Sequence, residues 1–319
     1  MTRTLLLTLA LAAAAVAQDP PKPKAESQLT LTATLDRADG KYVLGEDLQI
    51  EVKLENTGDK DVEVNELAYE ESSVSYAVKA DWTGGGTREY MLAVARPDAH
   101  VKARLAPGRV MLGAKKSMSC VRRFPTIAPG DFAITARYQS GAGEVVATAV
   151  KAKVEGSTAG NKLVVTVATH QHGSFSFELR PQDAPASVTS FVELVKKDFY
   201  RDMIFFRVIP KNWIQTGCPY ATGLGGPGYA MKSEADTQTA VHEPGTVSLA
   251  GNEKGGWTGS QFFVTLSRLP GLDKKFTIIG KLVDGQIDVV NAIGKADVDK
   301  NTDRPRNDIR IQSVTLAVK

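Results

Sequence analysis

The amino-acid sequence predicts a mainly β protein: an N-terminal β-sandwich followed by a closed β-barrel capped by two helices. Across 28–155, apolar and polar residues alternate in short segments between turn residues, as in strands that bury one face. Only two segments, both within 162–319, show helical spacing. A length of 319 residues also exceeds what one small domain usually needs. We therefore expect two domains joined by a glycine-containing linker at 156–161.

The first 17 residues have the pattern of a cleavable export signal. Arg3 supplies a positive charge, an apolar run follows over 5–16, and the run ends in the small residues of Ala15-Val16-Ala17. A membrane anchor is the alternative, but the run is short for a helix that spans a bilayer. The sequence thus predicts an exported protein, periplasmic or secreted, without membrane attachment after cleavage. The mature chain would begin at Gln18, with a proline-rich linker over 18–27.

Composition argues against several classes of function. The net charge is +3 and no dense block of Lys or Arg occurs, so nothing favours a nucleic-acid partner. His170 and His172 could bind a metal, but no third ligand accompanies them, and we expect no metal and no cofactor. The glycines of 223–228 lack the Lys of a phosphate-binding loop. Cys120 and Cys218 could form one disulfide in an exported protein or remain free thiols.

The first domain is expected to consist of strands alone. Turn residues such as Asp39-Gly40 and Pro129-Gly130 separate its apolar segments, and no amphipathic helix interrupts them. This spacing favours a β-sandwich. The stretch Gly45–Val64 resembles immunoglobulin-like accessory modules of exported bacterial proteins, which bind, space or support a partner domain. The alternating segments are Leu29–Leu35, Leu48–Leu54, Val62–Val64, Phe132–Tyr138 and Val145–Val154.

The second domain begins with two strands, Leu163–Ala168 and Phe175–Leu179, around a turn at 170–173. Pro185 then opens a helix whose apolar residues recur at helical spacing. Asp284 is placed to cap a second helix near the end of the chain. One helix near each end, with strands between them, fits a barrel whose mouths the helices cover.

Five blocks of this domain are similar to the cyclophilin-type peptidyl-prolyl cis–trans isomerases, in family order and near family spacing. The resemblance implies a cyclophilin-like barrel and an enzyme that acts on X–Pro bonds without a cofactor. Its partners would be Pro-containing segments of exported client proteins, whose folding it assists. The blocks are FYRDMIFFRVIPKNWIQTG at 199–217, TGLGGPGY at 222–229, GTVSLAG at 245–251, GSQFFVT at 259–265 and LDKKFTIIGKLVDG at 272–285.

The resemblance also implies roles for individual residues. Arg207 would donate a hydrogen bond to the prolyl nitrogen as the amide twists, because a guanidinium stays protonated at any working pH. Gln215 would hold the substrate backbone, and Phe263 and Leu272 would form the floor and wall of the proline pocket. The extended peptide would bind to Gln261 and to the backbone near Ala250 and Gly251.

The sequence departs from the family pattern around the pocket. An aromatic wall is replaced by Asn212, and Trp213 stands where the family usually has Met. Phe276 replaces a His of the groove. The pocket thus loses one apolar wall at Asn212, which Trp213 or Phe276 could restore. Further departures are Phe206 for His, Cys218 for Asp and Gly271 for Trp.

Two other functions stay open from the sequence. A degenerate cyclophilin could bind Pro-containing segments as a chaperone or scaffold without significant catalysis. The N-terminal sandwich could instead carry the main role as an adhesion or partner module. Neither its composition nor its motifs identify a partner for the sandwich.

Overall fold

A computed structural model describes residues 28–67, 73–92, 109–140, 143–251 and 257–319. The export signal expected over 1–17 and the linker expected over 18–27 lie outside the described residues. Within the described ranges, no helix combines the length and the apolar character needed to cross a membrane.

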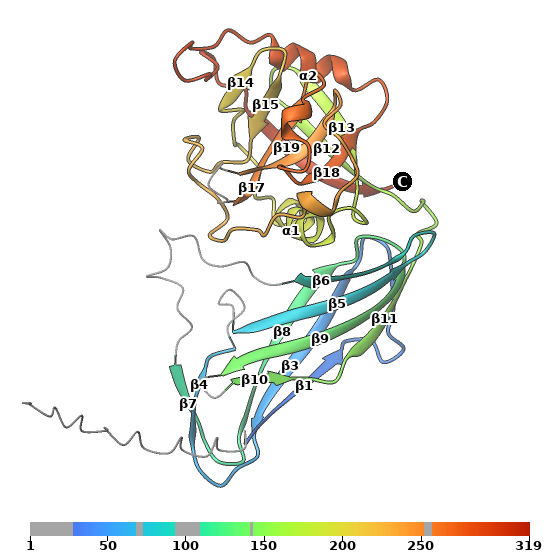
Figure 1. Ribbon diagram of the computed structural model, residues 1–319, viewed down its shortest axis with the longest axis vertical. Helices are drawn as coiled ribbons and strands as arrows, with labels where there is room; N and C mark the ends of the chain where they lie inside the picture. Colours follow the sequence, from blue (N-terminus) through green and yellow to red (C-terminus); the bar gives the residue numbers. More distant parts are fainter. Residues whose placement is uncertain (1–27, 68–72, 93–108, 141–142, 252–256) are drawn as a thin grey trace, which may run out of the picture.

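The first domain is a sandwich of two main sheets (Figure 1). One sheet has the order β1-β3-β8, and the other has the order β2-β11-β9-β5-β6 with β10 paired to β9. A two-stranded ribbon of β4 and β7 accompanies them. The strands are β1 Leu29–Leu35, β2 Lys41–Val43, β3 Asp47–Asn56, β4 Val62–Asn65, β5 Val74–Trp82, β6 Thr87–Leu92, β7 Arg109–Leu112, β8 Ser117–Pro125, β9 Gly130–Ser140, β10 Gly143–Val146 and β11 Val150–Glu155.

Burial follows the alternation predicted from the sequence. In β3 every second residue from Leu48 to Leu54 is buried, and in β9 the same holds from Phe132 to Tyr138. These residues fill the space between the sheets. The single strand expected over Val145–Val154 is wrong, because the chain forms two strands there. Both pair with β9, and the buried Ala147 between them donates its N–H to the carbonyl of Ala136 (2.9 Å).

The second domain is an eight-stranded sheet that curls into a barrel, with two α-helices (Figure 1). Its order is β14-β15-β17-β16-β18-β13-β12-β19. Pro185 stands at the start of α1, as predicted. Helix α2 starts at Ile287 with Gln286 at its N-cap, so Asp284 is not the cap. The elements are β12 Leu163–Thr169, β13 Gly173–Leu179, α1 Pro185–Lys196, β14 Arg207–Ile209, β15 Trp213–Thr216, β16 Thr246–Gly251, β17 Trp257–Thr265, β18 Ile278–Leu282, α2 Ile287–Gly294 and β19 Ile311–Val318, with short 3-10 turns at Ala235–Thr237 and Pro270–Leu272.

The barrel closes at a seam between the segment before β14 and the segment before β19. Among the described residues, no ladder of backbone hydrogen bonds joins β14 to β19, the two end strands of the sheet. Instead, the N–H of Phe205 donates to the carbonyl of Ile309 (2.9 Å), and the N–H of Val208 donates to the carbonyl of Asp303 (2.8 Å). The seam therefore brings the segment around residue 303 beside Arg207.

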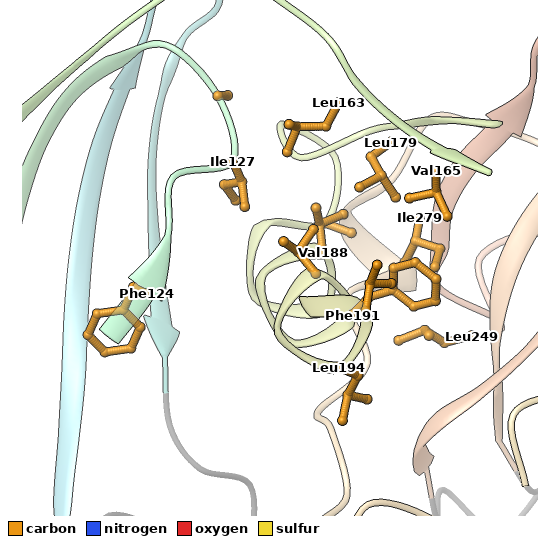
Figure 2. Packing of buried hydrophobic residues seen from close by; sticks show 14 of the residues in the cluster. Phe124, Ile127, Leu163, Val165, Leu179, Val188, Phe191, Leu194, Leu249 and Ile279 are labelled. Atoms are coloured by element: carbon orange, nitrogen blue, oxygen red, sulfur yellow. The ribbon is translucent and has the colours of Figure 1, made fainter. Parts of the chain in front are cut away.

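Helix α1 lies between the two domains (Figures 1 and 2). Figure 2 shows Phe124 and Ile127 of the sandwich on one side of the helix and Leu179 of the barrel on the other. Nine of its 12 residues are buried, including polar ones that a helix packed on one side would expose. The apolar residues of both domains consequently form one continuous cluster.

Polar contacts hold the same junction. Arg122 of β8 donates to both carboxylate oxygens of Glu193 in α1 (3.0 and 2.9 Å), and both side chains are largely buried. Arg88 of β6 donates to the carbonyls of Gln182 and Asp183 (2.7 and 2.8 Å). The expected linker 156–161 contains a tight turn, in which Ser157 and Gly160 exchange two backbone hydrogen bonds.

Candidate active site

Three residues expected to act on the substrate lie in one row across neighbouring strands. The register pairs Arg207 of β14 with Gln215 of β15, and Gln215 with Phe263 of β17. Residues paired in this way project to the same side of a sheet. Phe262 packs against Phe177 and Phe191 in the core. Because successive side chains of a strand point to opposite faces, Phe263 and the row with it lie on the outer face of the barrel.

Two neighbours fix the guanidinium of Arg207. Its Nε donates to Oδ2 of Asp303 across the barrel seam (3.3 Å). Its Cζ lies 5.5 Å from the ring centre of Trp213, a distance suited to a cation–π contact. The side chain is still 42% exposed, so it remains accessible to a bound peptide. Sequence reasoning missed Asp303, since nothing near it in the chain signals a contact with a residue 96 positions away.

Gln215 is held by a second glutamine beside it. Its Nε2 donates to Oε1 of Gln261 (3.0 Å), and Nε2 of Gln261 donates to the carbonyls of Gly223 and Gly225 (2.9 and 2.8 Å). Gln261 is only 1% exposed. The sequence assigned Gln261 to peptide binding, whereas its amide is committed to Gln215 and to the glycine-rich loop. Gln261 lies two residues before Phe263 on the same face of β17, where its amide supports Gln215, and its role in peptide binding stays a prediction.

Helix α1 anchors the far end of the glycine-rich loop. The hydroxyls of Tyr229 and Ser190 are 2.8 Å apart. Glu234, shortly after the loop, accepts hydrogen bonds from the N–H groups of Ala186 and Ser187 (3.3 and 2.8 Å). A carboxylate at a helix N-terminus is favourable for both partners. The loop is thus tied to the helix that joins the two domains.

Aromatic rings surround Phe263, the expected pocket floor. Trp213 lies 6.0 Å from it between ring centres, and Phe276 meets it edge-on at 5.6 Å. Leu272 and Phe276 are one turn apart, because the N–H of Phe276 donates to the carbonyl of Leu272 (3.2 Å). Asn212, directly before Trp213 in the chain, is half-buried. The floor ring of Phe263 is therefore flanked by two rings, one of which follows Asn212 directly in the chain.

The other predicted contacts lie at the end of β16. Ala250 is 5% exposed, and Gly251 pairs with Trp257 after an irregularity in the β16–β17 ladder. Residues 252–256, which follow directly, lie outside the described residues. Ala250 lies two residues beyond Ser248, the cross-strand partner of Phe263, and the peptide-binding role of Ala250 and Gly251 stays a prediction.

Both cysteines lie in the described part of the chain and are free thiols. Cys218 is 1% exposed beneath the glycine-rich loop, and its Sγ accepts a hydrogen bond from the N–H of Gly225 (3.3 Å). Burial raises the pKa of the Cys218 thiol, but the loop N–H groups outweigh it, so this pKa lies below its usual value. The sulfur of Cys218 therefore serves as a hydrogen-bond acceptor beneath the glycine-rich loop. Within the described ranges, no group of three or more His, Cys, Asp or Glu is arranged to bind a metal.

Comparison with known proteins identifies the barrel. The sequence model of the family described as cyclophilin type peptidyl-prolyl cis-trans isomerase/CLD matches residues 164–316. A peptidyl-prolyl cis-trans isomerase of Helicobacter pylori is 39% identical over 136 residues, which cover 42% of this chain and 81% of the relative. This chain belongs to the cyclophilin-type isomerase family. Isomerase B of Bacillus subtilis is 42% identical over 111 residues, covering 34% of this chain and 76% of the relative.

The cyclophilin match confirms the predicted family, fold class and enzyme class. It spans the barrel and leaves the sandwich outside, as an additional β module. A solved cyclophilin-type isomerase of Cryptosporidium parvum, studied in the presence of the dipeptide Ala-Pro, is 31% identical with a TM-score of 0.45. That likeness covers 49% of this chain and 99% of the solved one. By its family and its named relatives, the chain is a peptidyl-prolyl cis–trans isomerase.

Proposed function

We propose that this cyclophilin isomerises X–Pro bonds of exported proteins and so assists their folding, with Arg207 as the group that stabilises the twisted amide. The observation that carries the proposal is the row of Arg207, Gln215 and Phe263 on the outer face of the barrel. A hydrogen-bond donor, a backbone-binding amide and an apolar floor stand there side by side. The proline ring would rest on Phe263 while the preceding carbonyl rotates.

Rotation about an X–Pro bond needs no group beyond Arg207, Gln215 and the apolar floor. Rotation about a peptide bond has a barrier of ~18–20 kcal/mol, because resonance is lost as the amide twists. A catalyst must bind the twisted state more tightly than either planar isomer. In the twisted state the prolyl nitrogen becomes an acceptor, to which Arg207 would donate. A single pre-positioned donor of this kind contributes about 2.7–4 kcal/mol to other reactions.

The remaining site residues would bind the peptide around that bond. Gln215, held by Gln261, would hydrogen-bond the substrate backbone. Leu272 and Phe276 would form the pocket wall, and the backbone at Ala250 and Gly251 would run beside the extended chain. Trp213 and Asn212 would complete the wall near Arg207, where Trp213 already contacts both the floor ring and the guanidinium.

The export part of the proposal is supported by the N-terminal pattern of charge, apolar run and small residues. An exported enzyme would act in the periplasm or outside the cell, where newly exported chains fold. The sandwich, packed against α1, would serve there as a module fixed to the enzyme.

The test uses the whole chain from Gln18, since the sandwich covers α1. Acceleration of X–Pro exchange in a short peptide is measured for the parent, for Arg207→Ala and for Arg306→Ala. Arg306 is a matched control, because it is 58% exposed on the loop that carries Asp303. We expect at least a tenfold loss for Arg207→Ala, given the value of one such donor, ~2.7–4 kcal/mol, and no loss for the control.

Equal turnover by Arg207→Ala and the parent would contradict the assigned role. A parent that binds the peptide but does not accelerate exchange would favour the degenerate, binding-only cyclophilin. Folding assistance is tested separately, by refolding of an exported protein whose slow phase is proline isomerisation. No change in that slow phase at any enzyme concentration would contradict the folding role.

A further inference from the structure

A buried histidine lies directly behind the proposed pocket floor. The imidazole of His242 is parallel to the ring of Phe263 within 11°, with the ring centres 6.0 Å apart. Its side chain is 0% exposed, so it cannot touch a substrate. His242 sits in the turn before β16, a part of the chain to which sequence reasoning gave no role.

Both ring nitrogens of His242 have partners. Nδ1 lies 3.0 Å from Oδ1 of Asp273, and Nε2 lies 3.0 Å from Oγ of Ser248. Burial opposes the charge of Asp273, but hydrogen bonds from Arg268 and from His242 lower the pKa of this carboxyl to about 2. The carboxylate can only accept, so Nδ1 of His242 carries the proton and donates it. Nε2 then accepts from the hydroxyl of Ser248.

These bonds link the floor of the pocket to its wall. Ser248 is the cross-strand partner of Phe263 in the β16–β17 ladder. Asp273 follows Leu272 directly, and its carboxylate also accepts the backbone N–H of His242 (2.8 Å). A change in the position of the His242 ring would therefore move the floor and the wall relative to each other.

We propose that His242 is a positioning residue of the proline pocket, which fixes the ring of Phe263 and the segment of Leu272 in one arrangement. The inference rests on the proposed site, in which Phe263 and Leu272 bind the proline ring. Both partners of the ring belong to the pocket, because Ser248 pairs with Phe263 and Asp273 follows Leu272 directly. Loss of a histidine that only filled the core would lower stability and leave peptide binding unchanged.

The experiment separates positioning from stability. Kd and kcat/KM for an X–Pro peptide are measured for His242→Leu and His242→Asn in the whole mature chain. Asn places a donor near the position of Nδ1 and can keep the bond to Asp273, whereas Leu removes both bonds. Val78→Ala, in the buried face of β5 in the sandwich, controls for general destabilisation.

We expect His242→Leu to weaken peptide binding about threefold to tenfold, the range that corresponds to one typical hydrogen bond. His242→Asn should recover part of that loss. Asp273→Asn is measured as a second variant in case His242→Leu does not fold, and it should weaken binding in the same direction. Val78→Ala should leave Kd unchanged.

Arg207→Ala, measured in parallel, distinguishes failure of the positioning role of His242 from failure of the proposed site. If Arg207→Ala loses activity but the His242 and Asp273 variants bind the peptide as the parent does, the positioning role is overturned and the site stands. If Arg207→Ala is fully active, the proposed site itself fails. Equal losses in His242→Leu and His242→Asn would overturn the link through Asp273.

Discussion

Asp303 contacts Arg207 and the next residue, Val208, across the seam of the barrel. The carboxylate Oδ2 accepts a hydrogen bond from Nε of Arg207 (3.3 Å), and the backbone carbonyl of Asp303 accepts the N–H of the next residue, Val208 (2.8 Å). The φ angle of Asp303 is 56°, a conformation that Asp and Asn adopt more readily than most residues. The side-chain contact can therefore be removed without the backbone contact.

Asp303→Asn should lower kcat/KM about twofold to fivefold, because an exposed ion pair contributes ~0.2–1 kcal/mol. The loss should shrink as salt is added, since salt screens the parent's ion pair as well. Asp308→Asn is the matched control, because Asp308 lies on the same loop and pairs with Arg304 and Arg310 rather than with Arg207. An Asp303→Asn variant with parental kcat/KM at low salt would show that Arg207 needs no help from this carboxylate.

Trp213 should contribute more to the pocket than Asn212 does. The sequence alone favours a gain in affinity from Asn212→Phe, by filling an open wall. However, the ring of Trp213 already contacts Phe263 and the guanidinium of Arg207. Such contacts contribute ~0.5–1.5 kcal/mol for an aromatic pair and ~0.5–1 kcal/mol for an exposed cation–π contact.

We therefore expect Trp213→Ala to lower kcat/KM about tenfold, and Asn212→Phe to leave the peptide Kd within about twofold. The kcat/KM and Kd values are accompanied by a Tm for each variant, because added volume in a filled site can also destabilise the fold. A several-fold gain in peptide affinity from Asn212→Phe, at unchanged stability, would show that the pocket wall at Asn212 is open.

The sequence predicted the parts of the molecule that depend on local pattern. Alternation predicted β1, β3, β4 and β9 in the first domain and β12 and β13 in the second, but not β5 to β8, and Pro185 indicated the start of α1. The row of Arg207, Gln215 and Phe263 was predicted only through the family resemblance. Their register depends on pairing between distant strands, which no local pattern specifies.

What the sequence could not supply were contacts across the seam and across the domain junction. Asp303 and His242 act on residues far away in the chain, so their roles appear only when the barrel has closed. Helix α1 carries polar residues such as Ser187 and Thr189, which suggest a solvent-facing side. Both are buried in the folded chain, in which α1 lies between the sandwich and the barrel.

The ion pair between Arg122 and Glu193 should stabilise the junction. Their side chains are only 14% and 13% exposed, and removal of one partner of a buried pair typically costs ~3–5 kcal/mol. Glu193→Ala should accordingly lower Tm, toward the smaller end of that range because some exposure remains. The control is Glu155→Ala, whose pair with Lys153 is more than half exposed and should contribute little.

The double variant Arg122→Met with Glu193→Leu refines this prediction. Apolar residues of similar size often replace a buried ion pair without loss. Recovery of Tm in the double variant would assign the loss in Glu193→Ala to the charge left behind in the interface. Equal Tm values for Glu193→Ala, Glu155→Ala and the parent would show that the pair does not hold the domains together.

The exported protein should begin at Gln18, since small residues precede it at the end of the apolar run. Intact mass of material collected outside the cytoplasm decides this directly. Replacement of Ala15 and Ala17 by bulky residues should block cleavage and leave the longer chain. Exported material that retains Met1 would contradict the signal assignment.

The folded chain should lose stability in mild acid because of His242. Burial lowers the pKa of His242 below its usual value of 6.5, even though Asp273 beside it favours the proton. The unfolded chain therefore binds more protons than the folded one as pH falls below 6.5, and stability falls with it. The charged groups near the ring are Asp273, Arg268, which pairs with Asp273, and Glu243, which pairs with Arg268.

Other groups act in different pH ranges. The carboxylate of Asp273, with its pKa lowered to about 2, loses its stabilising effect only in stronger acid. Burial raises the pKa of Glu193 above 4.5 against the attraction of Arg122, so this group favours the folded state as pH falls, opposite in sign to His242. Between about pH 7.5 and about pH 5.5, the histidine should thus dominate the difference between the parent and a His242 variant.

Denaturant unfolding of the parent and of His242→Asn across that interval measures the difference. The parent should lose more stability than the variant on acidification, because the variant has no group at this site that can take up the proton. His172→Asn, in the turn before β13, is the control and should follow the parent. Parallel curves for the parent and His242→Asn would mean that the folded chain accepts the proton at His242 as readily as the unfolded chain does. The hydroxyl of Ser248 would then have to turn away from Nε2 at no cost, and the bond between them could not fix the ring behind Phe263.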